Sequence, residues 1–140
     1  DLDDEIKALS MENFLDRELN VGFSGGELKR AEVLKLYAQS PDLLLIDEPE
    51  SGVDIENIAV ISKAINKILQ NNASIKKRER SALIITHTGN ILNYIDADIG
   101  HVFMDGNIVC TGNPRSIMED IKKLGFTGCV TCIKEKKDNN

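Results

Sequence analysis

The sequence has no apolar run close to the roughly 20 residues that a membrane-spanning helix needs. Its three cysteines are an odd number, which does not suggest the paired disulfides of a small secreted protein. No N-terminal segment has the pattern of a secretory signal peptide. We therefore expect a cytoplasmic protein with no direct membrane insertion.

Positive charge is also scarce. The chain has 17 Lys and Arg residues against 23 Asp and Glu, for a net charge of -6 at pH 7. Nucleic-acid binding relies on clustered basic side chains, so this balance argues against a nucleic-acid partner. The 140 residues suit one globular domain, with 41% hydrophobic and 29% charged residues. The chain begins with Asp1 rather than Met, and we expect it to be a piece of a longer protein.

Hydrophobic spacing predicts alternating helices and strands. Two short apolar runs, 43–46 and 82–87, predict fully buried strands. A hairpin with its turn at Asp105 and Gly106 is expected near the C-terminal end. Helices are expected over residues 3–19, 24–39, 54–70, 91–95 and from 113 onward, and the tail 134–140 is expected to be disordered. This order predicts an α/β fold with a mostly parallel sheet.

Ser24-Gly25-Gly26-Glu27 opens the second expected helix. Ser24 and Glu27 have the spacing of a capping box. A cap alone does not explain two glycines, each of which costs roughly 1 kcal/mol against alanine in a helix interior. Close approach of the backbone to a ligand does explain them, and the N–H groups at a helix start form an anion site. We expect phosphate contact at this helix start, with a plain cap as the alternative.

Two acidic residues, Asp47 and Glu48, end the first apolar run. Ligands of parallel sheets bind outside the carboxyl ends of the strands. Successive strand residues point to opposite faces, so the two carboxylates need separate roles. Asp47 suits a Mg²⁺ site and Glu48 suits a general base that orients a water. The alternative is a pair of acids that caps the turn before Pro49.

His87 follows the second apolar run, "ALIIT", and is expected at the same edge of the sheet. An imidazole at this edge can donate to a phosphate oxygen or hold the attacking water. A single His at a strand end is often structural, and the functional role gains weight only from the other two motifs. We expect His101, on the hairpin, to be structural.

The order of these motifs resembles a known family. "FSGGE", "LLLIDEPE", "SGVD" and "ITH" resemble the signature motif, Walker B with its catalytic glutamate, the D-loop and the switch histidine of ABC-type ATPases. The resemblance covers residues 20 to about 115. It implies a partial P-loop NTPase fold. The implied parts are a helical-subdomain portion at 1–40, the C-terminal part of the catalytic core at 41–126 and a C-x-x-C segment with a disordered tail at 127–140.

Within the ABC ATPases, the sequence is most similar to SufC, the ATPase of the SUF iron–sulfur cluster assembly system. The similarity lies in "SGGELKR", "SGVDIENI" and "ITHTGNILNYIDADIGHVFMDGNIVCTGNP". Glu50 stands where many SufC chains have Asp, and Thr88 replaces an aromatic residue that often follows the histidine. The resemblance implies ATP and Mg²⁺ as cofactors, SufB/SufD-like scaffold proteins as partners and a head-to-tail dimer with ATP between the protomers.

The resemblance also implies a role for each motif. The signature residues 24–27 would contact, in trans, the γ-phosphate of ATP held by the other protomer. Asp47 would bind Mg²⁺, Glu48 would be the catalytic base and His87 would sense the γ-phosphate. The D-loop would act across the dimer through Ser51, Gly52 and Asp54.

A P-loop of the form G-x-x-x-x-G-K-[ST] is missing from the sequence. In ABC ATPases the P-loop lies in the N-terminal half of the domain and provides the main grip on the phosphates. We therefore expect that this chain alone neither binds ATP tightly nor hydrolyses it. The strands that are missing with the P-loop should also leave an apolar edge exposed.

Cys129 and Cys132 form one C-x-x-C near the C-terminus. Such a pair supplies half of a zinc or iron–sulfur site, but no second pair follows. A structural or incidental role is favoured over metal contact, and redox pairing is the remaining alternative.

Two further functions compete with a SufC-like ATPase. The first is the nucleotide-binding subunit of an ABC transporter, which only a partner would distinguish. The second is the C-terminal lobe of an ATPase of the SMC or Rad50 type in DNA repair. A long coiled coil and a basic DNA-binding face would favour that lobe, but the first expected helix is short and the net charge is negative.

Overall fold

A computed structural model of the chain describes residues 1–18, 21–70 and 77–138, with side chains described as far as residue 126. The chain forms two compact units, Asp1–Ile95 and Asp96–Asn140. The boundaries near residues 40 and 126 that the resemblance implies stay a prediction. The first unit contains residues 1–40 together with two strands.

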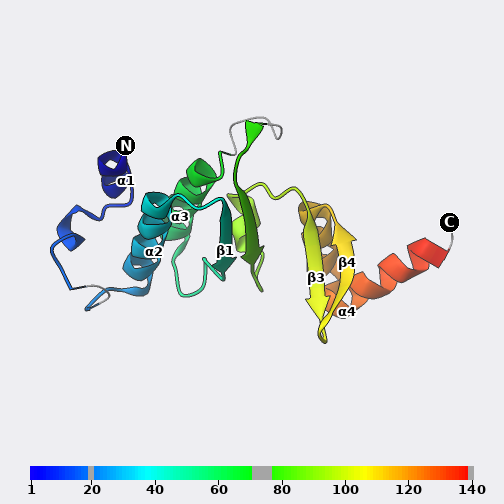
Figure 1. Cartoon of the computed structure of the whole chain (residues 1–140). Helices are drawn as coiled ribbons and strands as arrows, with labels where there is room; N and C mark the ends of the chain where they lie inside the picture. Colours follow the sequence, from blue (N-terminus) through cyan, green and yellow to red (C-terminus); the bar gives the residue numbers. More distant parts are fainter. Residues whose placement is uncertain (19–20, 71–76, 139–140) are drawn as a thin grey trace. The chain divides into compact units, whose positions relative to one another are not determined.

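The first unit places helices beside a small parallel sheet (Figure 1). Strands β1 (Leu43–Asp47) and β2 (Ser81–Ile85) pair in parallel, with Asp47 opposite Ile85. The three α-helices are α1 (Leu2–Ala8), α2 (Gly25–Gln39) and α3 (Ile55–Ile68). Among the described residues, short 3-10 helices lie at Glu12–Phe14 and Asn90–Asn93.

Helix α3 supplies the centre of the core. Its isoleucines recur at steps of three and four, so they share one face of the helix. These residues are buried with Leu44 of β1 and Val33 of α2 in one hydrophobic cluster. The members from α3 are Ile58, Ile61, Ile65 and Ile68. The helix that the sequence predicted over 54–70 is therefore confirmed.

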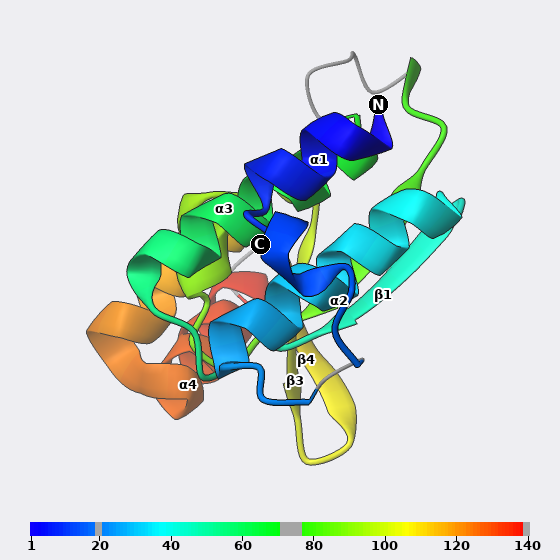
Figure 2. The same cartoon turned by 90° about the vertical axis from the view of Figure 1, so that its left-hand side faces the viewer.

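The single helix expected over residues 3–19 is wrong. Helix α1 ends at Ala8, and Ser10 takes a left-handed conformation with φ of 52°. This turn lets Leu9 and Met11 both enter the core. Helix α1 is attached to α3 by a hydrogen-bonded ion pair, in which the ammonium group of Lys67 donates to the buried carboxylate of Glu5. Figure 2 shows the ribbons of α1 and α3 side by side.

The expectation of fully buried strands is also wrong for the residues that the structure describes. Side chains of a strand alternate between the two faces of a sheet, and the helices cover only one face. Four side chains on the other face are more than half exposed. This open apolar face consists of Leu43, Leu45, Leu83 and Ile85.

The second unit is a hairpin packed against a helix. Strands β3 (Gly100–Met104) and β4 (Asn107–Gly112) are antiparallel, and Asp105 and Gly106 form the expected turn, both with positive φ. Helix α4 (Pro114–Asp138) follows, with a break at Gly125 where φ is 72°. Residues 134–138 lie in this helix, whereas the sequence predicted disorder. Packing of Ile117 against the hairpin explains how α4 is anchored at its start.

Asp54 caps the N-terminus of α3, which yields a pH-dependent prediction. Its carboxylate accepts from the backbone N–H of Asn57 at 2.9 Å and from the Asn57 amide at 2.8 Å. These hydrogen bonds hold the pKa of Asp54 below its ordinary value of 3.8. The ionised carboxylate therefore stabilises the folded state at pH values above its pKa in the unfolded chain. This stabilisation is lost as the pH falls through its lower pKa in the folded protein.

We predict that Asp54→Asn lowers stability at pH 7 and that the difference from the wild type shrinks as the pH falls below about 4. The measurement is urea denaturation of both proteins across a series of pH values. A difference that stays constant from pH 7 to pH 3 would contradict the role given to the ionised carboxylate.

Candidate nucleotide site

The parallel pairing of β1 and β2 brings two sequence motifs to one edge of the sheet. Asp47 is the last residue of β1, and His87 lies two residues beyond the end of β2. The backbone N–H of Glu48 donates to the carbonyl oxygen of Ile85 at 2.9 Å, which continues the pairing for one residue after β1. The edge where ligands of parallel sheets bind therefore carries an acidic pair and an imidazole.

Glu48 and His87 are in direct contact. Oε1 of Glu48 lies 2.8 Å from Nδ1 of His87, so a proton on Nδ1 donates to the carboxylate. Glu48 has a φ of 44°, an uncommon conformation for a residue other than glycine. Both side chains remain partly exposed. A carboxylate and an imidazole in this arrangement can hold a water and move a proton between them.

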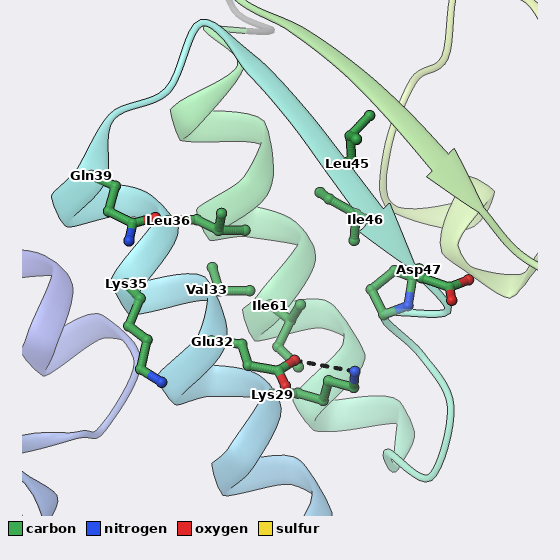
Figure 3. A pocket seen from close by; sticks show the side chains of 11 residues that line it. Lys29, Glu32, Val33, Lys35, Leu36, Gln39, Leu45, Ile46, Asp47 and Ile61 are labelled. Atoms are coloured by element: carbon green, nitrogen blue, oxygen red, sulfur yellow. Dashed lines mark ion pairs between the residues drawn. The ribbon is translucent and has the colours of Figure 1, made fainter. Parts of the chain in front are cut away.

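Asp47 stands apart from this pair. Its side chain is exposed, on the same face of the sheet as Leu45. Figure 3 shows its carboxylate pointing away from the hollow beside α2, in which Lys29 and Glu32 form an ion pair at 3.1 Å. The described residues contain no group of three side chains that could hold a metal ion. Mg²⁺ commonly uses one or two carboxylates with waters and phosphates, so a single Asp47 fits such a site.

The capping box predicted at the start of α2 is confirmed. The backbone N–H of Ser24 donates to Oε2 of Glu27 at 2.6 Å, and the backbone N–H of Glu27 donates to Oγ of Ser24 at 3.3 Å. The first of these hydrogen bonds is the main reason that the pKa of Glu27 lies below its usual value. The phosphate contact expected at this helix start stays a prediction.

The two glycines have a packing role that the sequence analysis missed. A Cβ at Gly25 would lie 3.0 Å from the carbonyl oxygen of Gly52, and a Cβ at Gly26 would lie 3.0 Å from Nδ2 of Asn57. Both distances are too short for a side-chain atom without movement of the neighbour. The start of α2 therefore touches the D-loop and the start of α3 within one protomer. No sequence signal links these segments, because more than 25 residues separate Gly25 from Gly52.

Residues 51–54, which are expected to form the D-loop, make a tight turn between β1 and α3. The backbone N–H of Ser51 donates to the carbonyl oxygen of Glu48 at 3.0 Å, and Gly52 has a φ of 70°. Ser51, Gly52 and Asp54 are all exposed. The D-loop is thus attached directly to the residue that contacts His87, while its outer surface remains accessible.

Two residues of the site had no role in the sequence analysis. Glu50 is buried, and its Oε1 accepts hydrogen bonds from the hydroxyls of Thr86 and Thr88. In the sequence, Glu50 and Thr88 stand out only as departures from the SufC pattern. Threonines on both sides of His87 only weakly indicate a functional role. The sequence alone does not show that both bind Glu50.

The remaining candidates lie in the second unit. His101 contributes its Nδ1 to a 2.8 Å hydrogen bond with the hydroxyl of Thr111, an arrangement that fits a structural side chain. The side chains of Cys129 and Cys132 lie outside the described residues. Across the ranges that the structure describes, none of the helices has both the length and the apolar character to cross a membrane.

Comparison with known proteins places the chain among ABC ATP-binding proteins. No protein-family model matches the sequence. A "Probable ABC transporter ATP-binding protein" of Streptococcus pyogenes is 41% identical over 128 residues, which are 91% of this chain and 47% of the relative. "Probable ATP-dependent transporter SufC" of Escherichia coli is 36% identical over 126 residues, 89% of this chain and 48% of the relative. The chain thus spans about half the length of these curated relatives.

Solved structures give the same result. An ATP-binding cassette of an ABC transporter in its ADP conformation matches with a TM-score of 0.64 at 25% identity, over 86% of this chain and 46% of that chain. An archaeal ribosome recycling factor, solved with a ribosomal stalk protein, matches with a TM-score of 0.68 at 28% identity, over 89% of this chain and 23% of that chain. This chain therefore belongs to the ABC family of ATP-binding proteins and corresponds to the C-terminal part of an ABC-type ATPase.

Proposed function

We propose that the chain supplies the hydrolytic half of an ATP site, in an ATPase of the SufC type that drives iron–sulfur cluster assembly. The observation that carries this proposal is the 2.8 Å contact between Glu48 and His87 at the carboxyl edge of the sheet. The proposal needs a second half that carries the P-loop, because this sequence lacks that motif.

Glu48 acts on the attacking water in this proposal. Its carboxylate accepts a proton from the water and orients it toward the γ-phosphate, as general bases do in phosphoryl transfer. His87 donates from Nδ1 to the carboxylate, and in the imidazolium form its Nε2–H would also donate to a phosphate oxygen. Asp47 would hold Mg²⁺, which supplies neutralisation of the charge on the phosphate oxygens when bound.

The signature residues and the D-loop act across a dimer in this proposal. The exposed Ser24 and the N–H groups at the start of α2 offer an anion site to ATP on a second protomer. The contact between Gly25 and Gly52 supports this assignment, because it joins the signature motif and the D-loop into one exposed surface.

The assignment to iron–sulfur assembly is supported by the 36% identity to SufC over 126 residues. The resemblance of residues 85–114 to the SufC family supports it as well. A second function, the ATP-binding subunit of a transporter, is favoured by the 41% identity to the streptococcal proteins. The two functions predict different partners: a SufB/SufD-like scaffold for the first and a membrane-embedded subunit for the second.

We predict that Glu48→Gln lowers ATP turnover of the complete protein by about 10²- to 10⁴-fold, the range that loss of a general base produces. The amide keeps the size of the side chain but is a far weaker base. Steady-state phosphate release with Mg²⁺ and ATP measures the effect. Glu79→Gln is the matched control, because exposed Glu79 precedes β2 at the opposite end of the sheet. Equal loss in both variants would remove the assignment of Glu48.

We predict that the 140-residue chain alone has no measurable ATPase activity, and that adding a separately produced P-loop half restores it. The reason is that the P-loop, which binds the phosphates, lies in that half. That half would also supply the layer that covers the open apolar face. Phosphate release by the chain, by the P-loop half and by their mixture is the measurement. Turnover by the chain alone that disappears in Glu48→Gln would show that the P-loop half is not needed.

We predict that the complete protein binds a SufB/SufD-like scaffold and that binding raises its ATP turnover several-fold. The measurement is co-purification followed by phosphate release with and without the scaffold. Recovery of a membrane-embedded partner, with no scaffold bound, would favour the transporter function.

A further inference from the structure

Glu50 is a buried carboxylate whose two oxygens are used very unequally. The residue is only 6% exposed. Its Oε1 accepts from the hydroxyl of Thr86 and, at 3.0 Å, from the hydroxyl of Thr88. Its Oε2 is buried and has no hydrogen-bond partner among the described residues. A buried polar atom without a partner costs free energy, so a side chain chosen only for stability would be better replaced by an apolar one.

The two threonine hydroxyls are fixed on both sides. The hydroxyl of Thr86 donates to Glu50 and accepts from the backbone N–H of Gly89 at 2.9 Å. The hydroxyl of Thr88 donates to Glu50 and accepts from the backbone N–H of Asn90 at 3.2 Å. Each hydroxyl has one proton to donate, so its donation to Glu50 requires an acceptor at that position. Glu50 therefore anchors the segment from residue 86 to residue 90.

His87 lies between the two anchored residues and contacts the other carboxylate of the same loop. Glu50 holds the residues on both sides of His87, while Glu48 contacts the His87 ring at 2.8 Å. Two carboxylates that are two residues apart thus engage three consecutive residues. A displacement of the segment away from Glu50 would move the ring away from Glu48.

We propose that Glu50 is a positioning residue, which fixes the ring of His87 against the Glu48 carboxylate by accepting hydrogen bonds from both flanking threonines. Glu50 touches neither substrate nor reacting atoms in this role. The effect on turnover rests on the proposed function, but the effect on the ring is a property of the chain and is measured without nucleotide.

The primary test is the tautomer of His87, measured by long-range ¹H–¹⁵N NMR of the chain at about pH 8. His101 is the only other histidine and belongs to the other unit, so its signals are an internal reference. The wild type should carry its proton on Nδ1, because the hydrogen bond to Glu48 selects that tautomer. Glu50→Met removes the acceptor and should release the ring into a mixture of tautomers. Glu50→Gln keeps Oε1 as an acceptor for both hydroxyls and should retain the wild-type tautomer.

A second pair of variants covers the case in which Glu50→Met does not fold. Thr88 is exposed, so its replacement leaves the core intact. Thr88→Val removes the hydroxyl at nearly constant shape and should shift the ring toward the mixture, whereas Thr88→Ser keeps the hydroxyl and should not. Folded Thr88→Val or Glu50→Met protein with an unchanged His87 tautomer would overturn the proposal.

The second readout is turnover by the complete protein. Loss of positioning should lower kcat about 10- to 100-fold in Glu50→Met with little change in KM for ATP, because ring placement affects the chemical step. Glu50→Gln should keep most of the wild-type kcat, because its side chain still accepts from both threonine hydroxyls. If the tautomer changes while neither Glu50→Met nor Glu48→Gln affects turnover, positioning stands and the hydrolytic function fails. If the His87 tautomer stays unchanged in Glu50→Met while Glu48→Gln abolishes turnover, the hydrolytic function stands and the positioning role of Glu50 fails.

Discussion

The parallel pairing of β1 with β2 is the constraint on which the site depends. Because both strands run in the same direction, their carboxyl ends meet at one edge although nearly 40 residues of chain lie between Glu48 and His87. The pairing continues past the end of β1 through the hydrogen bond from Glu48 to Ile85. An antiparallel pair would place the two motifs at opposite ends of the sheet. A one-residue slip would turn one of them to the other face.

The core of the first unit holds this pair of strands from one side only. Helix α3 packs its isoleucine face on Leu44, and α2 packs beside it, so Leu44 is buried while Ile46, Ala82 and Ile84 on the same face are partly buried. The other face presents leucine and isoleucine to solvent. An open apolar face next to a polar, functional edge is the arrangement expected of a sheet whose remaining layer belongs to another segment of protein.

Local patterns allowed the sequence to predict α3 from its isoleucine spacing, α2 from its capping box, β1 and β2 from their apolar runs, and the hairpin turn from Asp105 and Gly106. The prediction that β1 is buried on both faces was wrong, because an apolar run does not reveal how many layers of the fold cover the strand. The helix over 3–19 failed because the left-handed turn at Ser10 has no glycine or proline to mark it. The contact of Gly25 with Gly52 and the threonine pair on Glu50 were out of reach, since both depend on tertiary packing between distant segments.

The near contact between Gly25 and Gly52 also gives the first unit a mechanical asymmetry. A methyl group at Gly25 would lie only 3.0 Å from the carbonyl oxygen of Gly52, so the two backbones are close neighbours. Van der Waals repulsion rises steeply at shorter distances, but no hydrogen bond between these two glycines resists their separation in the described part of the chain. A movement of the start of α2 toward residues 51–54 is therefore opposed by repulsion after a short distance, whereas a movement away from them meets no such resistance at this contact.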